Sequence, residues 1–204
     1  MNIGIIGATG KTGRAVLKEA SRRNLTSTAI VRNPDKLKAD VPTLKRDLFQ
    51  LTTEDLAPFD VIICGFASGD KPAYLKAYSH LTGILAGTAT HLIVVGSGAT
   101  LYTDSTKQHL VADQLPSSLR ESSEWHLRAK AAVVTSNCQW TYVAPPYNYL
   151  SVAPRTGHYQ VGTDILLYNR LHQSIISYAD MAIALVDEAE NPQHLRTPMT
   201  VCWR

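Results

Sequence analysis

The chain opens with a short apolar run that is followed at once by three glycines spaced three residues apart. Residues 3–6 (IGII) precede the stretch GATGKTGR, whose glycines are Gly7, Gly10 and Gly13. An apolar run of this length predicts a buried strand, and the apolar spacing over residues 12–23 predicts an amphipathic helix. A turn that joins the two within so few residues needs the backbone freedom of glycine. The stretch therefore predicts a βα unit and, with it, a parallel sheet.

Strand-like and helix-like patterns alternate through residue 95. After the first unit, the sequence predicts strands over 26–31, 43–46, 60–64 and 91–95, short helices starting near 33–35 and 52–55, and a helix over 72–85. Right-handed crossovers between such strands place helices on both faces of the sheet. The predicted fold class is therefore α/β, with a Rossmann-type, doubly wound parallel sheet.

The pattern loosens after residue 98. Residues 101–122 are polar and predict a loop, and residues 145–171 mix Pro, Gly and Tyr and predict irregular structure. Between and after them we expect a helix over 123–135, a strand over 140–143, a helix over 179–190 and a strand over 197–201, with Asp180 as a structural residue at a helix N-terminus. No linker divides the chain. We expect one domain, 1–204, in which residues 145–178 contribute most of a small C-terminal substrate lobe.

Composition excludes several classes of function. The 204 residues carry a net charge of +3 without long basic runs, which argues against a nucleic-acid partner. No apolar segment approaches the ~18 residues of a membrane span. The three cysteines, Cys64, Cys138 and Cys202, lie far apart in apolar surroundings and predict reduced, buried thiols in a cytoplasmic protein, with no metal site. We expect a monomer or a weak homodimer that acts on a small molecule.

A strand, a glycine turn and a helix in this order are the context that a dinucleotide site requires. Gly7 permits the tight turn, Gly10 lets a pyrophosphate approach the main chain, and Gly13 lets the helix pack closely on the sheet. The helix N-terminus adds free N–H groups and a partial positive charge. The alternative is a glycine-rich turn that binds no ligand.

Arg32 ends the second predicted strand, where NAD-preferring sites place an acid for the ribose 2′-hydroxyl. A guanidinium pairs instead with a 2′-phosphate, so we predict a preference for NADP(H), with NAD(H) left open. The alternative is a solvated surface arginine.

Other residues near the strand ends have two interpretations each. Asp47 and Leu48 follow the third strand, beside the expected adenine pocket. Asp47 either accepts a hydrogen bond from the adenine amino group or caps the next helix. Gly65, followed by Phe66 and Ala67, either leaves room for the ribose and diphosphate or is a plain turn glycine.

Together these motifs resemble the atypical short-chain dehydrogenase/reductase superfamily, and within it the NmrA-like, NAD(P)-binding branch that includes biliverdin reductase B and NADH-flavin reductases. The resemblance rests on IGIIGATGKTGR, VRNPDKL, RDLF, VVGSGA and SIISYADMAIALVDEAENPQHLRTPMTV, and so spans nearly the whole chain. It implies a Rossmann-type sheet with a small C-terminal lobe. It also implies that Thr9, Lys11 and Thr12 line the pyrophosphate with the three glycines, and that Ser97 lies near the nicotinamide.

The chain departs from the superfamily at its usual Tyr-x-x-x-Lys pair. Lys130 is preceded four positions earlier by His126, which shares its helix face. A histidine with a pKa near ~6.5 can donate a proton near neutrality. Ser97, His126 and Lys130 are therefore the candidate catalytic residues. The alternative is that His126 is a surface residue and Lys130 a ribose ligand or a solvated lysine.

Three aromatic residues are candidates for the substrate site. Tyr147 and Tyr149 lie in APPYNYL just after the sixth strand, and Trp125 lies on the preceding helix. They either stack on a flat acceptor such as an isoalloxazine ring or pack the small lobe. The predicted function is an NAD(P)H-dependent reductase of a flavin or quinone, with flavin as substrate rather than bound cofactor. The alternative is a non-catalytic NADP(H)-sensing regulator that binds a protein partner.

Overall fold

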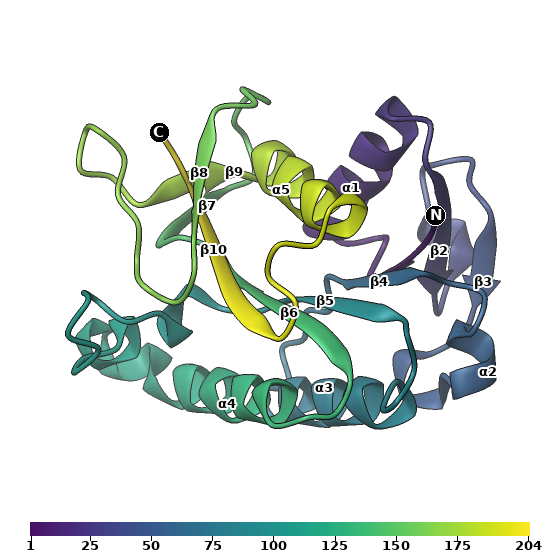
Figure 1. Cartoon of the computed structure of the whole chain (residues 1–204), viewed down its shortest axis with the longest axis horizontal. Helices are drawn as coiled ribbons and strands as arrows, with labels where there is room; N and C mark the ends of the chain where they lie inside the picture. Colours follow the sequence, from purple (N-terminus) through teal and green to yellow (C-terminus); the bar gives the residue numbers. More distant parts are fainter.

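The computed structural model describes residues 1–204 and contains one large sheet covered by helices on both faces (Figure 1). Seven parallel strands and one antiparallel edge strand form the sheet, in the order β3-β2-β1-β4-β5-β6-β10-β8. The strands are β1 (Asn2–Ile6), β2 (Thr26–Val31), β3 (Thr43–Lys45), β4 (Val61–Cys64), β5 (His91–Val95), β6 (Gln139–Ala144), β8 (Tyr159–Gly162) and β10 (Thr197–Trp203).

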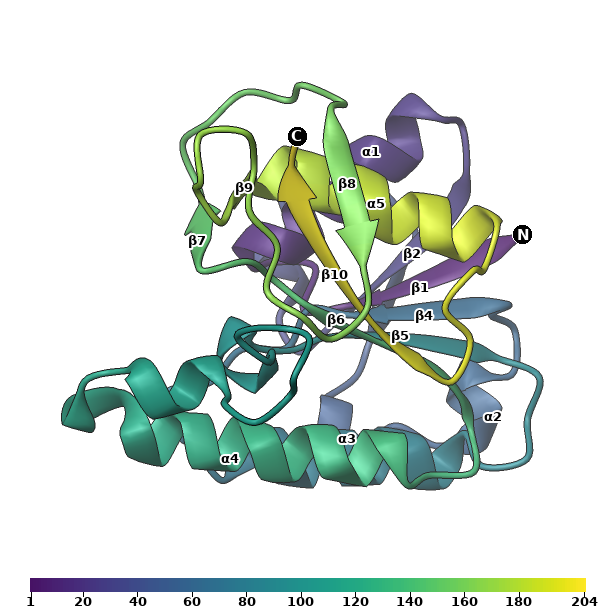
Figure 2. The same cartoon turned by 60° about the vertical axis from the view of Figure 1, so that its left-hand side comes forward.

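Helices cover both faces of this sheet. The helices α3 (Ala73–Ile84) and α4 (Ser117–Val134) pack on one face, and α1 (Lys11–Arg22) and α5 (Tyr178–Glu190) pack on the other (Figures 1 and 2). The short α2 (Thr53–Leu56) precedes β4, and four single-turn 3₁₀ helices lie in loops: η1 (Pro34–Lys36), η2 (Leu48–Gln50), η3 (Gly98–Thr100) and η4 (Val111–Gln114). No helix of the chain has both the length and the apolar character needed to cross a membrane.

The apolar core divides into two clusters, one on each face of the sheet. Side chains alternate along a strand, so Ile3 and Ile5 of β1 lie in the cluster under α1 and α5, whereas Ile6 lies in the cluster over α3 and α4. Gly4 points to the second cluster, where an added Cβ would meet Ile62 Cδ1 at 2.5 Å. The predicted fold class, a doubly wound α/β sheet, is confirmed.

The structure differs from the sequence prediction after residue 98. Helix α4 begins at Ser117 rather than at residue 123. Its first two turns (SSLRESS) are mostly exposed and carry four serines, so they lack the apolar spacing that marks a packed helix. Three short strands were not predicted: β8, and the parallel pair β7 (Asn148–Leu150) and β9 (Ile175–Ser177).

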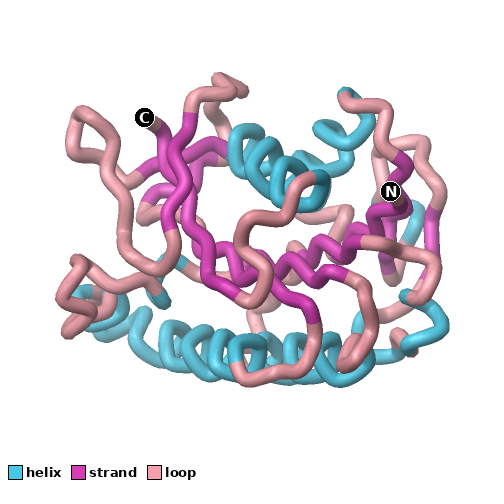
Figure 3. Tube along the Cα trace, in the orientation of Figure 1, coloured by secondary structure: helices cyan, strands magenta, loops and turns pink.

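The C-terminal segment gathers at one side of the molecule. The strands β7, β8 and β9 and their connecting loops lie together at the left of the view in Figure 3. Asp180, in the first turn of α5, is fully buried and accepts hydrogen bonds from Thr156, Gly157 and Trp203. The predicted structural role of Asp180 is therefore confirmed.

Candidate functional site

The glycine turn after β1 has no room for side chains. Gly7 has a φ of +76°, and a Cβ on Gly13 would meet Gly7 O at 2.3 Å and Ala8 Cα at 2.6 Å. The N-cap of α1 is Gly10, which offers no side-chain hydrogen bond to the first turn of the helix. The N–H groups of that turn therefore remain available to an anion.

A cavity of about 250 Å³ lies beside this turn, across the ends of β1, β2 and β3. It contains nine of the residues that the sequence predicted to bind a cofactor: Gly7, Thr9, Gly10, Arg32, Asp47, Leu48, Gly65, Phe66 and Ala67. It also contains Asn33, Lys36, Arg46 and Phe49, which were not predicted. Lys36 and Arg46 each lie within a few residues of a strand's carboxyl end, and this position could have identified them from the sequence.

Three cations stand around this cavity. Arg32 leaves 79% of its side chain exposed, and its Nε lies 3.7 Å from Asp47 Oδ2. Arg46 pairs with Asp55 (Nε to Oδ2, 3.3 Å). Asp47 caps η2 by accepting from Phe49 N–H at 2.9 Å, so its capping interpretation is the one observed. Lys36 adds a third positive charge at the same rim.

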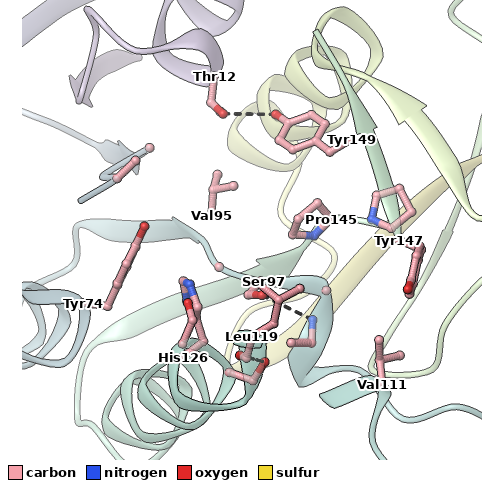
Figure 4. A pocket seen from close by; sticks show the side chains of 18 of the residues that line it. Thr12, Tyr74, Val95, Ser97, Val111, Leu119, His126, Pro145, Tyr147 and Tyr149 are labelled. Atoms are coloured by element: carbon pink, nitrogen blue, oxygen red, sulfur yellow. Dashed lines mark hydrogen bonds between the residues drawn. The ribbon is translucent and has the colours of Figure 1, made fainter. Parts of the chain in front are cut away.

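A second cavity, of about 470 Å³, lies next to the first; Figure 4 shows the side chains that line it. The two cavities share Gly65, Phe66 and Ala67, so they are two halves of one trough along the carboxyl ends of the strands. The second half is bounded by the loop after β5, by α4 and by the segment after β6. In an α/β sheet this edge is where ligands bind, next to the point at which the strand order reverses.

Two tyrosines connect this second half to the glycine turn. Tyr149 and Thr12 form a hydrogen bond between their hydroxyls at 3.1 Å (Figure 4). The Tyr149 ring stacks on Tyr178 with the centroids 3.6 Å apart, and Lys11 Nζ lies 5.9 Å from the Tyr178 centroid. Burial raises the pKa of the Tyr149 hydroxyl, against the opposing effect of its bond to Thr12. Tyr147 lines the same cavity but is 57% exposed.

Ser97 reaches the cavity from the loop after β5. Its N–H donates to the hydroxyl of buried Tyr142 at 3.2 Å, and its Oγ accepts from Ala99 N–H at 3.3 Å. A Cβ on neighbouring Gly96 would meet the Tyr142 ring at 2.0 Å, so the loop lies flat on that ring. Ser97 is thereby held at the cavity wall.

His126 projects from α4 into the same wall, beside Tyr74 (Figure 4). The two ring centroids lie 4.2 Å apart. Its Nδ1 is buried without a hydrogen-bond partner. Burial lowers the pKa of His126 below its ordinary value.

Four predicted residues do not line either cavity. Lys130 donates from Nζ to Thr100 O at 2.9 Å, and Trp125 packs under the Arg128 guanidinium, 4.8 Å from the ring centroid. Lys11 and Gly13 lie in the first turn of α1, and neither residue lines either of the two cavities. Conversely, several lining residues gave no local sequence signal, because their helix faces are chosen by packing: Tyr74, Leu119, Ser122 and Tyr178.

The trough fits a dinucleotide. The glycine turn and the uncapped start of α1 can hold a pyrophosphate, because no side chain caps the N–H groups of the first helical turn and Gly10 at the N-cap places no Cβ beside them. One half carries the cations and the other is aromatic and apolar, as the two ends of a nicotinamide dinucleotide require.

Comparison with known proteins agrees with this geometry. A family model described as NAD(P)H-binding matches residues 7–192. The chain is 39% identical over 208 residues to YwnB, an uncharacterized protein of Bacillus subtilis (strain 168), with 98% of each chain covered. SP1627 of Streptococcus pneumoniae TIGR4, named "a putative NADH-flavin reductase", is 33% identical, covers all of both chains and superposes with a TM-score of 0.94. The anaerobilin reductase ChuY of Escherichia coli O157:H7 shares the fold alone, at 15% identity, a TM-score of 0.74 and coverage of 100% and 97%.

Proposed function

Because the chain belongs to the NAD(P)H-binding family, we propose that it is an oxidoreductase that uses NADPH in preference to NADH to reduce a small planar acceptor such as a flavin or quinone. One observation carries the proposal. A single trough has a cationic half and an aromatic half, joined at residues 65–67. The similar structure that carries the name of an NADH-flavin reductase supports the same class of acceptor.

The chain's own residues bind and orient the two reactants. The glycine turn and the start of α1 would hold the pyrophosphate, and residues 65–67, which line both cavities, would contact the middle of the cofactor. When bound, NAD(P)H supplies a hydride to the acceptor, which takes up one proton to complete the two-electron reduction. The aromatic wall and Ser97 keep the acceptor stacked in the second half of the trough.

His126 is the candidate proton donor. Its ring lies in the wall of the acceptor cavity, beside Tyr74. In its protonated form this imidazole can deliver the proton that accompanies the hydride. Lys130 is not part of this proposal, because its amine is bound to the Thr100 carbonyl.

The preference for NADPH depends on the cations around the adenosine half. Arg32, Lys36 and Arg46 surround a space in which the ribose 2′-phosphate would lie. A charge-assisted hydrogen bond contributes about 1.5–3 kcal/mol, or roughly tenfold or more in affinity. Arg32→Ala should therefore reduce NADPH affinity about tenfold and leave NADH affinity nearly unchanged. Calorimetric titration measures both constants, with exposed Lys18→Ala as the control. An unchanged ratio contradicts the preference.

Turnover is tested directly. NADPH oxidation is followed at 340 nm with riboflavin, FMN and simple quinones as acceptors. We expect rates well above background with at least one of them. Background rates with every acceptor, in a protein that binds NADPH, would overturn the assignment.

A second candidate function is an NADP(H) sensor that binds a protein partner. It is favoured by the missing tyrosine of the usual Tyr-x-x-x-Lys pair, since His126 stands in its place, and Lys130 does not line the trough. Tight NADP(H) binding without hydride transfer, together with a partner that binds one redox form only, would select this function. Turnover of an acceptor would exclude it as the sole role.

A further inference from the structure

Resting on the proposed function, we infer that the acceptor is an uncharged planar ring system, and that the site recognises the ring without contacting any phosphate or carboxylate attached to it. The inference comes from the side chains of the acceptor cavity. We expect that an ionised group on a flavin or quinone adds nothing to its binding in this cavity.

None of the 21 residues that line the acceptor cavity is Asp, Glu, Lys or Arg. The polar groups in the wall are hydroxyls and one imidazole: Thr12, Ser97, Ser122, Ser123, Tyr74, Tyr147, Tyr149, Tyr178 and His126. The adenosine half of the same trough has three cations. The lining of the acceptor cavity therefore carries no fixed positive charge; the cation Lys11 lies 5.9 Å from the Tyr178 ring centroid but does not line the cavity.

An ionised group on the acceptor finds no counter-ion in this wall. Moving a phosphate or carboxylate out of water without a charged partner costs several kcal/mol, so such a group must remain in solvent. His126 does not replace the missing cation, because burial disfavours its charged form. Next to the lining residues on α3 and α4, Lys71 and Glu121 neutralise each other in an ion pair at 2.5 Å.

The wall suits an uncharged ring. Apolar side chains from several segments provide dispersion contacts, among them Phe66, Val95, Val111, Leu115 and Leu119. Tyrosine rings offer stacking, and the hydroxyls can donate to ring carbonyls. A volume of about 470 Å³ accommodates a nicotinamide together with a small fused ring.

Riboflavin and FMN test the inference, because they differ only in a phosphate. Binding of each oxidised flavin to the protein saturated with NADP⁺ is measured by calorimetry, and kcat/KM is measured with NADPH. We expect riboflavin to bind and react at least as well as FMN, and the ratio to be insensitive to ionic strength. Menadione and its sulfonate form a second pair, for which we expect the sulfonate to bind at least about threefold more weakly.

A variant that adds the missing charge sharpens the test. Ser122 lines the cavity from α4, and Ser122→Arg places a cation there, with Ser122→Gln as the uncharged control. We expect the FMN-to-riboflavin ratio of affinities to rise about tenfold in Ser122→Arg only, or in Leu119→Arg if Ser122→Arg does not fold. FMN binding that is threefold or more tighter than riboflavin in the parent, or no gain in either folded arginine variant, overturns the inference.

The two proposals fail in different ways. Preferred turnover of FMN would overturn the uncharged acceptor and leave the reductase standing. Binding of riboflavin without any NADPH oxidation would overturn the reductase and leave the uncharged site standing. If no uncharged ring binds at any attainable concentration, the inference on the acceptor is wrong.

Discussion

Neither Gly7 nor Gly13 accepts a side chain, because a Cβ on Gly7 would meet Gly65 O at 2.7 Å and a Cβ on Gly13 would meet the backbone of Gly7. A Cβ on Gly13 would meet Gly7 O at 2.3 Å, and this oxygen is backbone that the turn itself holds in place. Gly13→Ala should therefore lower the free energy of unfolding by about 1–3 kcal/mol through overpacking, and should weaken NADPH binding as α1 moves from the turn.

Urea denaturation and calorimetric titration measure these two effects of Gly13→Ala. Gly83→Ala is the matched control, because nothing lies within 4 Å of the added Cβ in α3. That control should be neutral or slightly stabilising. Equal behaviour of the two variants would show that the turn tolerates a methyl group.

Also at the residue scale, the partly buried imidazole of His126 leads us to expect that the reductase rate depends on pH. Burial places its pKa below the ordinary 6.5, so the proton-donating form is lost as the pH rises through that lowered value. The rate of hydride transfer should fall along this limb. His126→Phe keeps a ring against Tyr74 but carries no proton, and should lower kcat about 10²-fold at acid pH and remove the limb.

Single-turnover rates between pH 5 and 8 check this prediction. Trp125→Phe, on the same helix but outside the cavity, is the control and should keep the parent profile. The same pH profile in His126→Phe would exclude His126 as the donor.

At the scale of elements, Asp180 joins two segments, residues 156–157 and the end of β10, to the start of α5. Its carboxylate accepts from Thr156 N–H at 2.8 Å, from Gly157 N–H at 2.9 Å and from the Trp203 indole at 2.5 Å. Burial opposes the charge, but these bonds prevail and hold the pKa of Asp180 below its usual range. The stability that they contribute is present above the unfolded pKa and is lost as the pH falls through the folded one.

In Asp180→Asn, one carboxylate oxygen becomes an amide N–H₂ group. That group cannot accept the hydrogen bonds that Thr156, Gly157 and Trp203 donate to Asp180 in the parent. The substitution should lower the free energy of unfolding by about 3 kcal/mol at pH 7, where the parent carboxylate is charged. Urea unfolding at pH 7 measures the loss, and exposed Asp70→Asn serves as the control. A loss below about 0.5 kcal/mol would mean that the segment is held elsewhere, for instance by the Arg155–Glu19 pair at 2.9 Å.

At the scale of the whole molecule, a buried hydrogen-bond network makes the free energy of unfolding depend on pH. It surrounds His91, the first residue of β5, away from the trough. His91 Nε2 lies 2.8 Å from Thr141 Oγ1, and the single Thr141 hydroxyl proton has two acceptors within reach, Glu188 Oε1 at 3.2 Å and His194 O at 2.9 Å. His91 Nδ1 has no partner. This hydrogen-bond network thus connects β5, β6, α5 and the loop before β10, which are far apart in sequence.

Burial lowers the pKa of His91 from 6.5 to about 4. Between these values the unfolded chain binds a proton that the folded chain does not, so stability decreases as the pH falls from 6.5 to 4, by about 3 kcal/mol in all. His91→Gln should flatten this slope, and exposed His109→Gln should not. Urea midpoints at pH 7, 6, 5 and 4 measure it. Parallel slopes in the parent and His91→Gln would contradict the assignment.

The sequence by itself determined the sheet and the position of the glycine turn. Strand and helix periodicities are local, and the spacing of Gly7, Gly10 and Gly13 marks a turn within a few residues, so both features can be predicted without knowing the rest of the fold. The position of Arg32 at the end of β2 is equally local, since carboxyl ends of parallel strands share one edge.

Only the tertiary structure decided which side chains form the acceptor cavity. His126 and Trp125 are neighbours on α4, yet one lines the cavity and the other packs outside it. The pairing of β7 with β9 and the stacking of Tyr149 on Tyr178 join segments that are distant along the chain. Such choices depend on how α3, α4 and the C-terminal segment pack together, because the face that a helix buries is set by its neighbours and not by its own sequence.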